Sequence, residues 1–86
     1  MTIFWQMKLT TKQQQVLAAL RANGECTTTT DADGTEWICV YLNNALGDLP
    51  MSARAFAGHL SKLRQAGYYR PIDGLFGDVR IDGEAK

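Results

Sequence analysis

Basic side chains gather in one stretch of this 86-residue chain. Between Met51 and Ile72 there are four basic residues and no acid, whereas between Asn23 and Pro50 there are five acids and no base. The formal net charge of the whole chain is zero, unlike the basic balance usual for nucleic-acid-binding domains. A local basic face on a neutral protein can still contact phosphates. The charge distribution therefore favours an anionic partner for this stretch.

The strongest candidate site is the outer side of a predicted helix over residues 52–67. Ser52 is a suitable N-cap, and at about 100° per residue small and hydrogen-bonding residues fall opposite the apolar face. Arg54 lies in the first turn, where recognition helices usually contact bases, and arginine prefers guanine while glutamine prefers adenine. The alternative is that these residues form only the solvent-exposed face of an amphipathic helix and contact no partner. The candidate DNA-contacting residues on this helix are Ser52, Arg54, Gly58, Ser61, Lys62 and Gln65.

Three further arginines are expected to contact phosphates, which position a protein without specifying sequence. Arg64 is predicted near the buried flank of the helix, Arg70 on the strand after it, and Arg80 on a returning strand. The loop between those strands carries acids, which would repel a phosphate backbone. Its apolar residues Leu75 and Phe76 are therefore expected to contact protein or the core rather than wedge into a minor groove.

Catalytic and metal chemistry find little support in the sequence. An enzyme needs a nucleophile or an acid–base pair in a pocket, but the acids fall in turns and in the tail, and the hydroxyls of residues 27–30 have no partner base. Cys26 and Cys39 are too few for a disulfide scaffold and wrongly spaced for zinc, and His59 is the single histidine. We expect no enzymatic activity, no metal and no cofactor.

The elements that must position the candidate residues begin with a helix over residues 10–24. Thr10 or Thr11 can cap it, with a glutamine three residues later completing a capping box. Gly24 is expected to end it in the left-handed conformation. Residues 27–46 are ambiguous between a β-hairpin and a strand plus a helix. We favour a short strand near Trp37 followed by a short helix over about residues 40–46.

After the helix of residues 52–67, which Gly67 ends, a hairpin is predicted over residues 68–82. Its strands are residues 68–72 and 79–81, joined by the glycine-rich loop 73–78. An apolar segment, residues 1–9, precedes the first helix. The chain is short enough that all of this belongs to one domain, residues 1–86.

The stretch from Ser52 to Arg70 resembles the recognition helix and following strand of winged helix-turn-helix proteins. Leu60 and Leu63 take the leucine positions of that helix, Gly67 closes it, and a strand then leads into a wing. The resemblance covers roughly residues 10 to 82, and it is to the superfamily pattern. It implies an α+β fold with three helices and a C-terminal two-stranded wing, with the helix in the major groove and the wing near the backbone.

These observations predict a small DNA-binding transcriptional regulator of the kind found in bacteria, phages or plasmids. Its partner would be double-stranded DNA, and we expect a homodimer through Ile3–Leu9 or the first helix, because one module of this size gives a small interface. The rival hypothesis is a winged-helix module that binds or inhibits a host protein. The longest apolar run, Trp37 to Leu42, is far shorter than a bilayer span, so we expect a soluble cytoplasmic protein.

Overall fold

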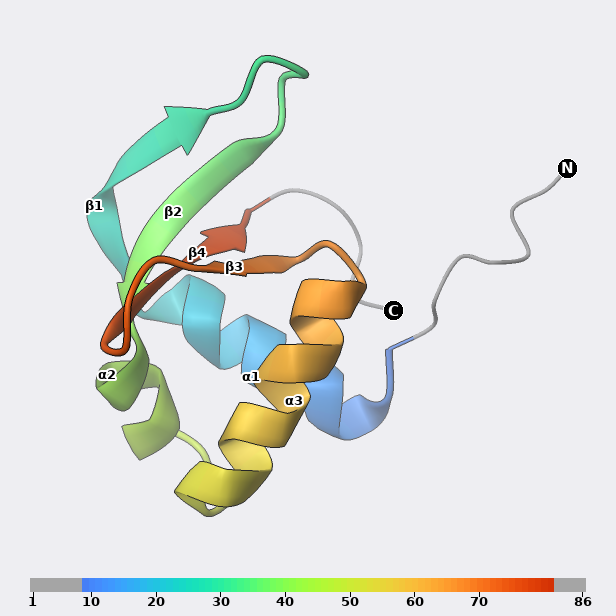
Figure 1. The fold of residues 1–86 in the computed structure, drawn as a ribbon. Helices are drawn as coiled ribbons and strands as arrows, with labels where there is room; N and C mark the ends of the chain where they lie inside the picture. Colours follow the sequence, from blue (N-terminus) through green and yellow to red (C-terminus); the bar gives the residue numbers. More distant parts are fainter. Residues whose placement is uncertain (1–8, 82–86) are drawn as a thin grey trace, which may run out of the picture.

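A computed structural model describes residues 9–81, except for the side chains of residues 26–28. In these residues the fold is α+β with three helices, and the helices gather on one side while the first hairpin projects beyond them (Figure 1). The elements in chain order are α1 (Thr11–Ala22), β1 (Gly24–Thr30), β2 (Glu36–Tyr41), α2 (Leu42–Gly47), α3 (Ala53–Gln65), β3 (Tyr69–Pro71) and β4 (Phe76–Arg80).

The C-terminal hairpin predicted as a separate two-stranded wing is part of a larger sheet. Within the described residues four antiparallel strands lie in the order β1-β2-β4-β3. Strand β4 pairs with β3 on one side and with β2 on the other, where Ile38 lies opposite Val79 and Cys39 opposite Asp78. The prediction missed this pairing because β2 and β4 are far apart in the chain, and only the folded backbone brings their donors and acceptors together.

Residues 27–46 form both of the structures that the sequence offered as alternatives. A hairpin of β1 and β2 comes first, with Gly34 at φ 89° and its amide donating to the Asp31 carbonyl at 2.9 Å. Helix α2 then follows β2 directly, beginning at Leu42 rather than near residue 40. The predicted strand near Trp37 and the helix after it are therefore confirmed, although the strand is longer than predicted. The β-hairpin, which the prediction did not favour, is present as well.

The first helix begins as predicted and ends for a different reason. Thr10 Oγ1 accepts a hydrogen bond from the Gln13 amide at 3.1 Å, and the Gln13 side chain accepts one from the Thr10 amide at 3.0 Å, which confirms the capping box. Gly24, however, is the first residue of β1 and has no left-handed backbone. A Cβ at this position would lie 2.6 Å from Cδ1 of Ile38, so a larger residue here would displace the Ile38 side chain on β2.

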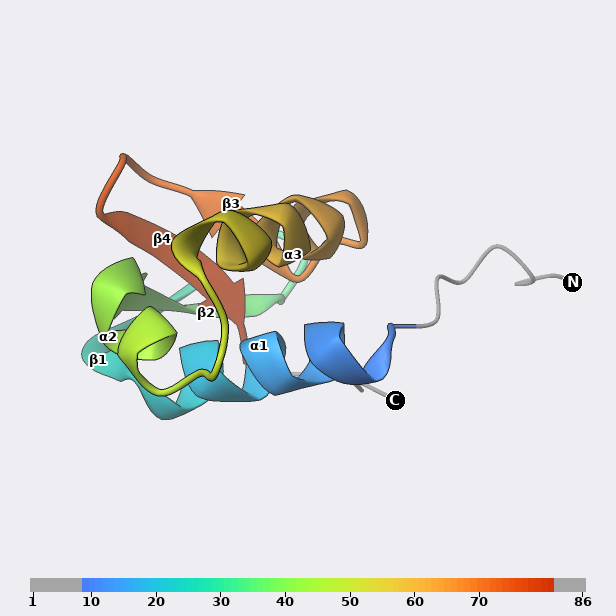
Figure 2. The same cartoon turned by 90° about the horizontal axis from the view of Figure 1, so that it is seen from below.

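The core lies between the helices and the sheet. Helices α1 and α3 pack side by side in front of the sheet (Figure 2), and their apolar faces meet residues of β2 and β4. Leu9 belongs to this core, whereas the rest of the predicted apolar segment, residues 1–8, lies outside the described residues. Among residues 9–81 no helix is long and apolar enough to cross a membrane. The fully buried side chains are Val16, Leu17, Leu20, Val40, Leu63 and Val79.

Candidate nucleic-acid interface

Helix α3 carries most of the predicted site, and local signals define both of its ends. The Ser52 hydroxyl accepts a hydrogen bond from a first-turn amide at 3.1 Å. At the other end Gly67, at φ 89°, donates to the Arg64 carbonyl at 3.1 Å, and Tyr68 donates to the Leu63 carbonyl at 2.9 Å. This pair of bonds is a Schellman motif, which satisfies the last carbonyls of the helix. The predicted stop at Gly67 is therefore confirmed.

The two faces of α3 separate as the helical period predicted. Phe56, Leu60 and Leu63 are buried against the core, while the opposite side is open to solvent. No described atom outside α3 lies within 4 Å of a Cβ built at Gly58, so none of residues 9–81 covers the centre of this side. The exposed residues of this outward face are Ser52, Arg54, Gly58, Ser61, Lys62 and Gln65.

Arg64 was expected near the buried flank of the helix, and it lines a cleft on that side together with Tyr69 and Arg70. The residue is exposed, because the core-facing stripe is narrow and runs through Leu60 and Leu63. Arg64 therefore lies between the core-facing stripe and the outward face, at the C-terminal end of α3.

Arg70 is partly exposed, and its side chain is held by residues of the neighbouring strands and of the β1–β2 turn. Its guanidinium lies 3.8 Å from the centre of the Trp37 ring and donates to Asp31 at 3.0 and 3.2 Å and to Asp78 at 3.2 Å. Trp37 Nε1 also donates to Asp31 at 2.8 Å. We call these four residues the Arg70 clamp. It ties the β1–β2 turn to β3 and β4, so Arg70 has a structural role that the sequence did not reveal.

Replacing Arg70 with alanine is expected to lower the free energy of unfolding by about 1–2 kcal/mol, since partly exposed charged hydrogen bonds and stacking each contribute modestly. Lysine should not restore this loss, because it lacks the planar fork that reaches two carboxylates at once. Urea unfolding followed by far-UV circular dichroism measures the change. Arg64→Ala is the matched control and should leave the midpoint unchanged; an equal loss in both variants would contradict a clamp.

Arg80, the third predicted phosphate contact, lies half-buried on β4. Its amide donates to the Tyr68 carbonyl at 2.8 Å, and its carbonyl accepts from Nε of Arg21 at 2.8 Å. The structure therefore places Arg80 at the junction of α1 and the sheet, away from the group of cations on α3.

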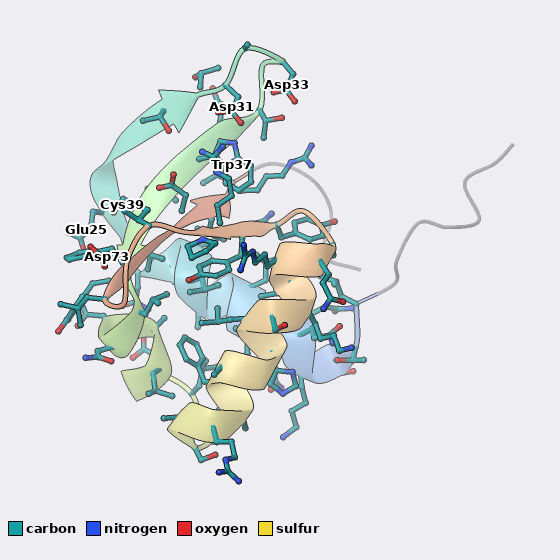
Figure 3. All side chains as sticks on the ribbon, in the orientation of Figure 1. Glu25, Asp31, Asp33, Trp37, Cys39 and Asp73 are labelled. Carbon is teal, nitrogen blue, oxygen red and sulfur yellow. The ribbon has the colours of Figure 1, made fainter. Side chains whose placement is uncertain are left out.

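The ion pairs divide the basic residues into two classes. In the part of the chain that the structure describes, both salt bridges belong to Arg70. Arg54, Lys62 and Arg64 of α3 form none there. Figure 3 shows the labelled acids on strands and turns of the sheet, away from α3. A chain of zero net charge thus presents a locally basic helix surface.

The turn between β3 and β4 is exposed and is hydrogen-bonded to the start of α2. Asp73 accepts hydrogen bonds from the amides of Leu75 and Phe76 at 2.7 and 2.8 Å. The Leu75 carbonyl accepts from the amide of Leu42, the first residue of α2, at 2.9 Å. This turn therefore closes the N-terminal end of α2, whose preceding residue Tyr41 forms no side-chain cap.

The surroundings of two reactive side chains, Cys39 and Tyr69, shift their pKa values. Burial raises the pKa of the Cys39 thiol, and the nearby carboxylates of Asp78, Glu25 and Asp73 raise it further, which disfavours the nucleophilic thiolate. Burial also raises the pKa of Tyr69. In residues 9–81 no three His, Cys, Asp or Glu side chains gather as metal ligands.

An open cleft of about 570 Å³ lies between the end of α3 and the sheet. It is lined by Asp31, Trp37, Arg64, Gly67, Tyr69, Arg70 and Pro71.

Comparison with known proteins gives no significant match: no family model, no curated sequence and no solved structure aligns with the chain.

Proposed function

We propose that this protein binds double-stranded DNA through the outward face of α3. The observation that carries the proposal is the group of three cations, Arg54, Lys62 and Arg64, on an exposed helix surface without an ion pair among the described residues. Cations that form no ion pair with the described residues are available to release counterions from DNA phosphates. Gly58 and Ser61 are small, so the helix axis can come close to the bases.

The arrangement of the elements supports the same proposal. Helices α2 and α3 are joined by a short turn and followed by the β3–β4 hairpin, and β2, β4 and β3 are neighbours in that order. This is the arrangement expected of a winged helix-turn-helix module, in which the second helix of the pair enters the major groove. On this basis Arg54, Ser61 and Gln65 face base edges, while Lys62 and Arg64 contact phosphates.

A fluorescence-anisotropy titration of a labelled random-sequence duplex tests the proposal. We expect binding at micromolar to tens-of-micromolar protein in low salt. With the two phosphate contacts of Lys62 and Arg64 the logarithmic salt slope should be about −1.8, so raising salt fourfold should weaken binding by about 12-fold. Absence of binding at tens of micromolar protein in low salt would rule the proposal out.

One observation favours a second candidate function, a module that acts by binding another protein. The turn between β3 and β4 exposes Ile72 and Leu75 beside Asp73, a chemistry that suits protein rather than phosphate. A negative DNA titration would make this candidate the leading one.

A further inference from the structure

The turn between β3 and β4 presents an apolar surface with an acidic edge. Ile72 and Leu75 are 54% and 52% exposed. Phe76 follows Leu75 at the start of β4, and its half-buried ring lies 5.2 Å from that of Tyr41, centroid to centroid. We call these four residues the wing-tip surface. Asp73 lies within the turn, and Figure 3 draws Glu25 and Asp73 close to Cys39 at this end of the sheet.

The chemistry of this surface limits what can cover it. An occupant must be apolar to cover Leu75 and Ile72, and it gains by carrying positive charge, because the edge holds Glu25 and Asp73. Two wing-tip surfaces meeting across a two-fold axis would bring like charges together. Such a contact would also be small, since a stable interface needs about 800 Å² from each partner. The surface therefore suits a short basic and apolar segment.

The chain itself contains a segment of this chemistry. Residues 3–8 include four apolar side chains and one lysine and lack any acid: Ile3, Phe4, Trp5, Met7 and Lys8. We propose that residues 3–8 of one copy dock on the wing-tip surface of a second copy, and that the exchange is reciprocal. Reciprocal exchange closes a two-fold dimer and doubles the buried area of a single contact.

The distance between the start of α1 and the wing-tip surface explains why residues 3–8 would dock on a second copy and not on the surface of the same chain. Leu9 is held in the core just before α1, while Glu25 follows the other end of that helix. Figures 1 and 2 show the start of α1 and the β3–β4 turn on opposite sides of the molecule. The 12 residues of α1 span about 18 Å. Six fully extended residues reach about 20 Å. Within one copy, residues 3–8 would therefore be used up in spanning α1, and no residue of the segment would be left to cover the wing-tip surface.

Sedimentation equilibrium of the full chain tests this dimer. We expect a mass of twice 9.5 kDa at about 100 µM chain, falling toward one chain on dilution. Leu75→Ser on the surface and Trp5→Ser in the segment should each raise the dimer Kd about tenfold or more. Lys8→Glu should raise it in low salt and less in high salt, because the acidic edge then repels the segment.

The control is Ala18→Asp, on the exposed side of α1, which should leave the dimer Kd unchanged. Circular dichroism checks that each variant remains folded. A monomer at about 100 µM, a dimer insensitive to either serine variant, or a dimer broken by Ala18→Asp would each overturn the proposal. None of these results bears on DNA binding by α3, so the two proposals can fail separately.

Discussion

Alanine in place of Arg54 or Lys62 is expected to weaken DNA binding about tenfold or more for each variant. Both side chains are exposed on α3 and lack an ion pair within the described residues. Each can therefore contact DNA without first breaking an internal bond, and a contact of this kind contributes about 1–3 kcal/mol. Anisotropy titrations of the variants against the same duplex measure the effect.

The two variants should differ in kind, because the residues occupy different parts of α3. Arg54 lies in the first turn, where it faces base edges. When duplexes that bind the protein are selected from a random pool, Arg54→Ala should therefore also discriminate less among the selected DNA sequences. Lys62→Ala should weaken binding to all DNA sequences equally and reduce the magnitude of the logarithmic salt slope by about 1.

Lys12→Ala provides the matched control, since Lys12 is an exposed cation on α1. It should have little effect on DNA binding. An equal loss in Lys12→Ala would mean that overall charge, and not the α3 surface, attracts the duplex. Unchanged affinity in both α3 variants would exclude this helix as the interface.

Gly77→Ala is expected to lower the free energy of unfolding by about 1–3 kcal/mol, because it overpacks the core. Gly77 is buried on β4, and a Cβ there would meet Cε1 of the Tyr69 ring and lie 2.8 Å from its hydroxyl oxygen. Tyr69 is only 6% exposed, so its ring has little room to move away. Urea unfolding measures the loss as a lower midpoint.

Gly74→Ala is the control for this effect, since nothing lies within 4 Å of a Cβ built there. Its midpoint should remain near that of the unmodified protein. A second check is Tyr69→Leu, in whose background Gly77→Ala should cost less, as expected for two residues in direct contact. If Gly77→Ala unfolds at the same urea concentration as the unmodified protein, the close packing of ring and backbone is not a constraint.

The sequence alone predicted the features that depend on residues a few positions apart. The Thr10 capping box, the Ser52 N-cap and the stop at Gly67 each involve atoms within one helical turn or one turn motif. The outward face of α3 followed from the helical period, because burial of Leu60 and Leu63 determines which residues point away. Local hydrogen bonding and periodicity are present in the chain before it folds.

The tertiary structure decided the features that join distant residues. Pairing of β2 with β4 converts a two-stranded hairpin into one edge of a sheet. The contact of Gly24 with Ile38 gives that glycine a packing role instead of a helix-ending one.

The cations illustrate the same division. Sequence identified Arg54, Lys62, Arg64 and Arg70 as one basic stretch, but only the fold brings Asp31 to Arg70, across 39 positions. Among the described residues, the three cations of α3 have no such partner. Composition and periodicity determined which residues are charged and which helix face is polar. Which charges are already neutralised depends on long-range packing, because an ion pair forms only where the folded backbone places two side chains within reach.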